Sequence, residues 1–407
     1  MFDAEWRLAV RNLIRHRRRS ISALFAIGLG VTTLVIASGF IQWIFWAMRE
    51  ATIQSQLGHI QVVKRGYFEQ GQSDPFHYLL PEASPQLDVI RHSPHVSAVT
   101  PRLFFSGLIS HGERTISFVG VGVEPEGERQ VSRQLALIRG HDLDAEGGVT
   151  LGEGLAASLG VAPGEKVVLL ATTVSGGINA VELIVRGIFR TAAKAYDDVA
   201  LRIPITAART LVRAAGSHEW VVLLDDTART RPVLEALRNR LQPAAADLEL
   251  VPWYDQADFY NKTVTLFSRQ VNVVWILIAA VMVLSISNTM IMSVLERTRE
   301  IGTLLAMGFR RRRIRAQFLK EGAVLGIAGG FAGLVAGFIL ARAISAIGIS
   351  MPPPPGMAVG YIGQIMITWP LMLQALALGL LTSVIASLYP AWKASRMAIV
   401  DALRYYG

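Results

Sequence analysis

The sequence contains no cysteine, which excludes a disulfide framework, a thiolate nucleophile and a cysteine-ligated metal site. It also lacks the G-x-x-x-x-G-K-S/T loop that holds nucleotide phosphates and the H-E-x-x-H and G-x-S-x-G motifs of hydrolases. His92 and His95 form the only close histidine pair. Two ligands are too few for a structural metal site, so we interpret both as loop residues. These absences predict a chain that is not an enzyme and that binds no metal or cofactor itself.

Charged residues are also scarce: they make up 17% of the chain, whereas 52% of its residues are apolar. This balance favours a membrane protein over a soluble one. The formal net charge is +9, but residues 51–268 carry slightly more Asp and Glu than Lys and Arg. The basic excess therefore belongs to the flanks of the apolar runs, where it indicates topology, and it argues against nucleic acid as a partner.

Four apolar runs are long enough to cross a bilayer, which takes about 20 apolar residues. We predict membrane spans at residues 20–49, 270–295, 322–349 and 369–390. Basic residues before the first span and after the second place both termini, and the segment 296–320, in the cytoplasm. Residues 1–19 have the amphipathic pattern of an interfacial helix, and residues 391–407 form a cytoplasmic tail.

Residues 50–268 contain no run that is able to span a membrane. Short stretches of alternating apolar residues, such as 58–63, 115–121 and 181–185, predict strands, and helical patches lie between them. This mixture predicts an α+β fold for a large extracytoplasmic domain. Residues 350–368 form a second outer segment, a loop with a stiff polyproline run.

The segment 296–320, between the second and third predicted spans, is rich in charge. Within it, Ile301, Leu304 and Leu305 recur near helical spacing beside charged residues. This pattern predicts a short amphipathic helix on the cytoplasmic surface. A plain solvated loop of topogenic charge is the alternative.

The run E-R-T-R-E-I-G-T-L-L-A-M-G-F-R at residues 296–310 resembles the signature of ABC-transporter permeases of the MacB/FtsX type. This family includes macrolide exporters, lipoprotein-releasing permeases of the LolC/LolE kind and the cell-division permease. The pattern A-x-R-N-L-x-R-H-R-R-R-S at residues 9–20 and the helix–turn–strand piece at residues 152–167 resemble the same family. Ile399 departs from the family pattern, in which a proline is usual.

The resemblance implies four transmembrane helices and a large two-lobed α/β domain, with a β-rich lobe inserted at about residues 103–225. It places the chain in a bacterial inner membrane, with this domain in the periplasm. It implies that a separate cytoplasmic ABC ATPase binds ATP and Mg, and that the permease forms a dimer with a second copy or a paralogous permease. A periplasmic adaptor or lipoprotein carrier is a further expected partner, besides membrane lipid.

The resemblance also assigns the charged segment to contact with the ATPase, as a coupling helix. Polar contacts are expected from Glu296, Arg297, Arg299 and Glu300. Ile301, Leu304 and Leu305 are expected to fill a groove of the ATPase, and Gly302 and Gly308 to allow close approach of the backbone.

The third predicted span carries glycines in two interleaved registers. They are Gly322, Gly326 and Gly330 in one, and Gly329, Gly333 and Gly337 in the other. Glycine at every fourth position makes a smooth helical face on which another helix packs closely in lipid. We expect close helix packing at these faces, with a self-dimer contact as the alternative.

The central parts of the predicted spans contain no charge. A polar substrate path through the bilayer would be expected to show intramembrane charge. The sequence therefore favours helices that transmit movement to the outer domain. The resemblance implies that ATP drives this movement, for lipoprotein release or efflux of a periplasmic substrate. A signalling permease that activates a cell-wall hydrolase is the alternative. A membrane-anchored receptor or enzyme is disfavoured, because one anchor would suffice for it.

Overall fold

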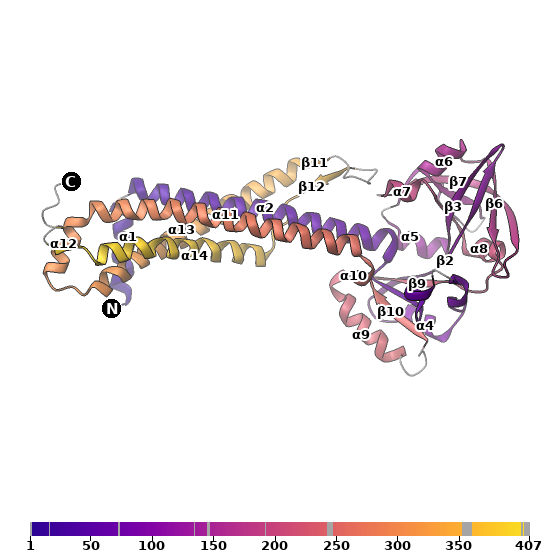
Figure 1. Ribbon diagram of the computed structural model, residues 1–407, viewed down its shortest axis with the longest axis horizontal. Coiled ribbons are helices and arrows are strands. Elements are labelled where there is room, and N and C mark those ends of the chain that lie inside the picture. Colours follow the sequence, from indigo (N-terminus) through magenta and orange to yellow (C-terminus); the bar gives the residue numbers. More distant parts are fainter. Residues whose placement is uncertain are drawn as a thin grey trace. The chain divides into compact units, whose positions relative to one another are not determined.

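The computed structural model of the chain describes residues 2–15, 17–71, 74–133, 135–144, 147–191, 193–241, 247–351, 360–399 and 402 (Figure 1). The chain divides into two compact units. The first, here called the helical unit, comprises Met1–Trp46, Thr263–Ser350 and Ile362–Gly407. The second, called the mixed unit, comprises Ala47–Lys262 and Met351–Tyr361.

In the described part of the chain, the helical unit is built from six helices. They are α1 (Phe2–Arg15), α2 (Arg17–Thr52), α11 (Asp258–Glu296), α12 (Thr298–Ala306), α13 (Arg311–Ile347) and α14 (Trp369–Ser395). Within the described part of the chain, α2, α11, α13 and α14 are the helices long and apolar enough to cross a membrane. Each predicted span falls on one of these four, although α13 ends two residues before the predicted end of its span. Helices α2 and α11 also carry the chain between the two units.

The four long helices lie alongside one another in the helical unit (Figure 1). Their shared core consists of buried apolar side chains from every one of them, among them Ile27, Val31, Met282, Ile286, Phe318, Leu325, Ala375 and Ala386. Helix α11 begins at Asp258, twelve residues before the predicted span at 270, because no glycine or proline interrupts the polar turns that precede its apolar run.

The mixed unit contains one ten-stranded sheet in the order β10-β1-β9-β2-β3-β8-β5-β7-β4, in which β6 pairs with β2 and β7. Its neighbours are antiparallel except for β3 with β8 and β5 with β7. The strands are β1 (Ile60–Lys64), β2 (Val96–His111), β3 (Arg114–Val123), β4 (Ala136–Gly140), β5 (Val149–Gly152), β6 (Lys166–Thr172), β7 (Ile178–Arg190), β8 (Ala200–Pro204), β9 (Glu219–Leu224) and β10 (Leu248–Pro252). Two short strands, β11 (Ile349–Met351) and β12 (Tyr361–Gly363), pair separately.

Short helices connect the strands of the mixed unit. They are η1 (Ile53–Leu57), α3 (Tyr67–Gln70), η2 (Pro75–Tyr78), α4 (Pro85–Arg91), α5 (Pro125–Val131), α6 (Glu153–Leu159), α7 (Lys194–Asp197), α8 (Ile205–Val212), η3 (Thr227–Arg229), α9 (Thr230–Leu241) and α10 (Trp253–Gln256). Strands and helices are thus mixed along the segment for which the sequence predicts an α+β fold.

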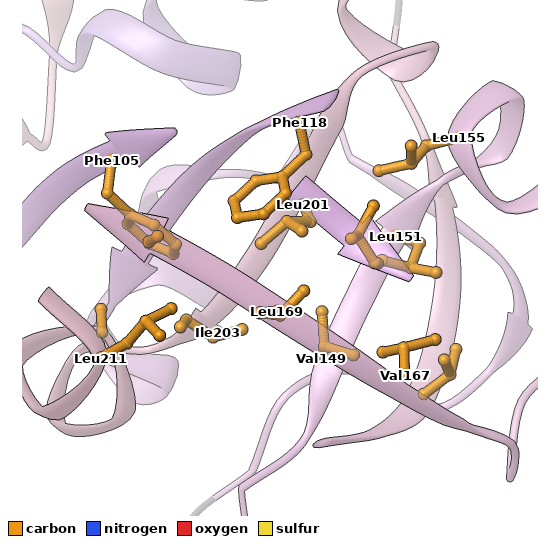
Figure 2. Packing of buried hydrophobic residues seen from close by; sticks show 14 of the residues in the cluster. Phe105, Phe118, Val149, Leu151, Leu155, Val167, Leu169, Leu201, Ile203 and Leu211 are labelled. Atoms are coloured by element: carbon orange, nitrogen blue, oxygen red, sulfur yellow. The ribbon is translucent and has the colours of Figure 1, made fainter. Parts of the chain in front are cut away.

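The larger hydrophobic cluster of the mixed unit draws its buried residues from positions 103 to 214. Figure 2 shows the side chains that fill it from several strands and from α8, among them Leu151, Leu169 and Leu211. The rings of Phe105 and Phe118 meet edge to face, with centroids 5.6 Å apart.

A second cluster lies on β1, β9, β10 and the helices α4 and α9. Its largest member, Trp220, belongs to β9 and is 1% exposed. Strand β9 falls inside the insert predicted at 103–225, but it pairs with β1 and packs in this second cluster. The division into lobes remains a prediction.

Candidate functional site

Helix α12 occupies the charged segment that the sequence singled out. Glu296, Arg299 and Glu300 are exposed, and Leu304 and Leu305 are half-buried. Three other candidates, Arg297, Ile301 and Gly302, are buried within the chain itself. One face of α12 therefore packs on the helical unit, while the other carries charge outward.

Arg297 lies at the junction of α11 and α12, and it points inward. Its Nη1 donates to both carboxylate oxygens of Glu321, on α13, at 2.9 and 3.1 Å. The guanidinium also lies 5.3 Å from the ring centre of Phe318. Arg297 is 8% exposed and Glu321 is 2% exposed. A buried carboxylate of the same chain therefore already binds Arg297, and its direct contact with a partner stays a prediction.

Glu321 also joins the first helix to this site. The side-chain amide of Asn12, on α1, donates to Glu321 Oε1 at 2.8 Å. One carboxylate on α13 thus holds α1 and the start of α12 together. Sequence reasoning missed Glu321, although a lone acidic residue at the beginning of an apolar run is a recognised signal for a functional or paired group.

Two further ion pairs lie at the surface near this site, one between α1 and α12 and the other between α2 and the end of α11. Arg15 Nη1 lies 3.6 Å from Glu300 Oε1, and both side chains are largely exposed. Arg19, near the start of α2, pairs with Glu296. Exposed pairs of this kind contribute about 0–1 kcal/mol, so the buried Glu321 group dominates the arrangement.

Gly308 has a local structural role besides the partner contact that the resemblance implies. It adopts φ +86°, and its N–H donates to the carbonyl of Leu305, while the N–H of Phe309 donates to the carbonyl of Leu304. This is the Schellman pattern that ends a helix, and glycine suits its left-handed position. Gly308 therefore shapes the turn between α12 and α13.

The two glycine registers of α13 face two different helices. A Cβ added at Gly322 or Gly326 would meet Ser387 or Ser383 of α14. A Cβ added at Gly333 would lie 2.6 Å from a carbonyl oxygen of α2. Gly330 likewise faces α14, and Gly329 and Gly337 face α2. Each register therefore brings one neighbouring backbone close to α13.

Hydroxyl groups cross both of these close contacts. Thr32 Oγ1, on α2, donates to the carbonyl of Gly333 at 2.9 Å, and Ser383 Oγ, on α14, donates to the carbonyl of Gly322 at 2.6 Å. Small residues let the helices approach closely enough for such side chains to reach a backbone acceptor.

Helix α14 continues through Pro390, at which the sequence analysis ended the fourth span, as far as Ser395. Proline has no N–H, so the carbonyl of Ala386 loses its helical donor. Ser287 Oγ, on α11, donates to that carbonyl at 2.8 Å instead. The helix therefore continues because a neighbour satisfies the acceptor that proline leaves open.

The end of α2 that lies in the mixed unit is anchored to its sheet. The N–H of Leu224 donates to His59 Nδ1 at 3.0 Å, so Nε2 carries the ring proton and donates to Thr227 Oγ1 at 3.0 Å. Thr227 in turn donates to Glu50, on α2, at 3.1 Å. Burial lowers the pKa of His59 to about 4, so its ring is neutral at physiological pH. Ile53 packs near Trp253 in the same hydrophobic cluster.

The described residues contain no group of three or more His, Asp or Glu side chains arranged to hold a metal ion. The two histidines considered from the sequence have other partners. His92 Nδ1 lies 2.8 Å from the carbonyl of Asp88, and His95 Nδ1 lies 3.0 Å from Asp225 Oδ2.

Two protein-family models match this chain. One, described as an FtsX-like permease C-terminal domain, matches residues 272–399. The other, described as a MacB-like periplasmic core domain, matches residues 20–240, which is more than half of the chain.

Several curated proteins are similar in sequence. An uncharacterized ABC transporter permease of Methanocaldococcus jannaschii is 30% identical over 54% of this chain and 54% of its own length. A macrolide export ATP-binding/permease protein, MacB, of Syntrophobacter fumaroxidans is 29% identical over 48% of this chain and 26% of its own. A pyoverdine export ATP-binding/permease protein, PvdT, of Pseudomonas fluorescens is 32% identical over 51% of this chain and 30% of its own. The chain thus spans between about a quarter and about half of these relatives.

Two solved structures also resemble the chain in part. The periplasmic region of MacB from Actinobacillus actinomycetemcomitans aligns with 53% of this chain and 94% of its own, at 15% identity and a TM-score of 0.39. The extracellular domain of the ABC-type transporter YknZ from Gram-positive bacteria aligns with 48% of this chain and all of its own, at 12% identity and a TM-score of 0.34.

Proposed function

This chain belongs to the family of ABC-transporter permeases of the MacB/FtsX type, and on that premise we propose that it is a membrane subunit driven by a cytoplasmic ABC ATPase. In this proposal α2, α11, α13 and α14 cross a bacterial inner membrane, and the mixed unit lies in the periplasm. Both termini and α12 are cytoplasmic. ATP and Mg are bound by the ATPase, and the permease works as a dimer with a second copy or a paralogous permease.

The observation that carries the proposal is the carboxylate of Glu321. It binds Arg297, at the start of α12, and Asn12 of α1, and it belongs to α13. Breaking a buried ion pair by separating its partners is costly. A push on α12 is therefore passed to α13 and α1 instead of being lost in a loose loop. The side chains of Glu296, Arg299 and Glu300 are exposed and would make polar contacts with the ATPase, although Glu296 and Glu300 are also paired within the helical unit.

Movement of α13 has a route to the outer domain. Its two glycine faces pack on α2 and α14, and α2 and α11 continue into the mixed unit. There, Glu50 is hydrogen-bonded to Thr227 and Ile53 is buried, so the end of α2 is fixed to the sheet. We infer that displacement of the helices moves the mixed unit, which acts on a periplasmic substrate or partner.

Export of a periplasmic compound is the proposed use of this movement. Relatives named for macrolide export and pyoverdine export support it. Lipoprotein release, the other use expected from the sequence, would employ the same coupling. Identification of the periplasmic partner distinguishes the two, since an adaptor protein indicates export and a lipoprotein carrier indicates release.

A charge reversal on the exposed face of α12 tests the coupling. Glu300→Lys is expected to abolish co-purification of the ATPase while leaving the permease folded and inserted. Glu235→Lys, a matched reversal at an exposed position of α9 in the mixed unit, is expected to have no effect. Unchanged co-purification with Glu300→Lys would reject the coupling role of this helix.

The absence of native cysteine allows a direct test of topology. Thr303→Cys on α12 and Ser175→Cys in the mixed unit each introduce a unique thiol at an exposed residue. A membrane-impermeant maleimide added to intact spheroplasts is expected to label the second thiol and to label the first only after lysis. The opposite pattern would overturn the proposed orientation.

A further inference from the structure

A pocket of about 200 Å³ opens in the mixed unit beside α5, β4 and β8. Its polar lining consists of Glu128, Arg129, Ser132, Arg133, Asp142 and Arg202. Apolar side chains from β3, β4 and the segments around β4 complete its walls, and Leu137 of β4 is 41% exposed. The pocket therefore combines an apolar wall with a group of guanidinium side chains.

One of the two carboxylates in this pocket is already neutralised from outside it. Arg102 does not line the pocket, but its Nε and Nη2 donate to the two oxygens of Glu128 at 3.1 and 2.8 Å. Both side chains are almost completely buried. Two parallel bonds between a guanidinium and a carboxylate form a strong and specific pair, so Glu128 contributes little free negative charge to the pocket.

Arg202 is consequently a second cation beside a carboxylate that is already paired. It is 8% exposed, its Nη2 donates to Ser132 Oγ at 3.2 Å and lies 3.5 Å from Glu128 Oε1, and its buried Nε has no hydrogen-bond partner. A buried charge without full compensation is unfavourable. Arg202 therefore favours an additional negative partner.

The remaining charges of the pocket leave an excess of positive charge. Arg129 donates to the carbonyl of Leu143 at 2.7 Å and lies 3.7 Å from Asp142. Arg133 is exposed, and within the described part of the chain no ion pair is found for it. Because Glu128 is paired with Arg102, the three guanidinium groups of the lining face one other carboxylate, that of Asp142. The pocket therefore favours a negatively charged ligand.

We propose that this pocket binds a carboxylate attached to a small apolar body, with Arg202 and Arg133 as its anion-binding residues. Planar guanidinium groups match the geometry of a carboxylate, and the apolar wall accommodates the attached carbon chain. The ligand is either a free small acid or an acidic side chain of a bound protein. The proposal is independent of the ATPase coupling, because it concerns residues of the mixed unit alone.

The test uses the full-length chain in detergent. Leu137→Cys introduces the only thiol of the protein at the rim of the pocket, and an environment-sensitive fluorophore is attached to it. Butyrate is the free-acid probe, with butyramide as its neutral isostere at equal ionic strength. A blocked Leu-Glu-Leu peptide represents a protein side chain, with Leu-Gln-Leu as its control.

We expect saturable binding of butyrate or of the glutamate peptide, and no binding of the corresponding neutral control. The probe that binds shows whether the carboxylate belongs to a free acid or to a protein side chain. Arg202→Gln is expected to weaken binding by roughly tenfold or more, because a hydrogen bond to a charged group is lost. Arg133→Gln, at an exposed position where folding is not at risk, is expected to weaken it several-fold. Arg231→Gln, on the exposed side of α9, is the matched control and should change nothing. Equal responses to acid and amide, or unchanged affinity in Arg133→Gln and Arg202→Gln, would overturn the proposal.

Discussion

The hydroxyl of Ser287 donates to the carbonyl of Ala386 at 2.8 Å, and Pro390 is the residue whose missing N–H leaves this carbonyl available. A buried backbone carbonyl without a donor is unfavourable, especially in lipid. The contact between α11 and α14 therefore depends on a proline and a serine that lie about a hundred positions apart in the sequence.

Ser287→Ala is expected to destabilise the protein by about 0.6 kcal/mol, and by no more than about 1.7 kcal/mol, which is the range of hydrogen bonds between transmembrane helices. In a Pro390→Ala background the same substitution should cost less, because the alanine that replaces the proline restores the N–H that bonds to the carbonyl of Ala386. Thermal denaturation in nanodiscs of the two single variants and the double variant measures the difference. Equal costs in both backgrounds would show that the serine and the proline act independently.

The buried pair of Arg297 and Glu321 gives a larger expected effect. Glu321→Leu leaves a buried guanidinium without its carboxylate, so we expect a loss of about 3–5 kcal/mol in stability and a strong reduction in the yield of folded protein. Arg297→Met together with Glu321→Leu should recover much of this loss, because both charges are then absent. Arg299→Met, at an exposed position of α12, serves as the control and should change stability by less than about 0.5 kcal/mol. A double variant no better than Glu321→Leu alone would argue against the ion pair as the cause.

Two glycines of α13 are expected to differ in how well they tolerate substitution by alanine. Gly333→Ala would place its Cβ 2.6 Å from the carbonyl oxygen of Gly28 and 2.8 Å from Val31 Cβ, so we expect a loss of about 1–3 kcal/mol from overpacking. Gly330→Ala meets only the terminal Cδ1 of Leu376, at 2.8 Å, which is able to move. The gain in helix propensity, about 1 kcal/mol, should make this second substitution nearly neutral. Melting temperatures that fall equally for both variants would contradict the prediction.

Glu219 is expected to make stability depend on pH. Burial raises its pKa to about 7, although Arg102 lies 3.7 Å away and acts in the opposite direction. The folded chain then keeps a proton on Glu219 that the unfolded chain releases at a pH of about 4.5. Stability should therefore decrease as the pH rises through this interval, by at most about 3 kcal/mol, and this contribution should be constant at higher pH.

The matched variant for this prediction is Glu219→Gln, which keeps the shape of the side chain and does not titrate. Denaturation of the full chain at pH 5 and pH 8 is expected to show that the native protein loses more stability than the variant between these values. Parallel pH profiles of the two proteins would mean that Glu219 is ionised in both states.

Local patterns in the sequence predicted much of the helical unit. The lengths of the apolar runs indicated the four long helices, and the spacing of glycines in α13 predicted two faces for close packing. Neither pattern reveals which helix covers each face, because that depends on partners far away in the chain, such as Thr32 and Ser383. Only the three-dimensional arrangement shows that the two registers face α2 and α14.

The candidate site was harder to predict for the same reason. A run of charge beside apolar residues indicates an amphipathic helix, but it does not say which charge points inward. Arg297 and Arg299 look alike in the sequence, yet the first is buried against Glu321 and the second is exposed. Glu321, the partner of Arg297, lies 24 positions further along the chain, at the start of an apolar run. The hydrogen bond between Glu321 and Asn12 joins residues that most of the sequence separates.

The hydroxyl bonds of Thr32 and Ser383 are of a different kind from that of Ser287. The glycine carbonyls that accept them lie in the uninterrupted helix α13 and keep their own helical donors, and a freed hydroxyl is able to bond within its own helix. Rotation or sliding of α13 against α2 and α14 thus leaves no polar group without a hydrogen-bond partner. Separation of α11 from α14, in contrast, leaves the carbonyl of Ala386 without a donor. Among these contacts, the one between α11 and α14 is therefore the one whose loss leaves a backbone acceptor without a donor.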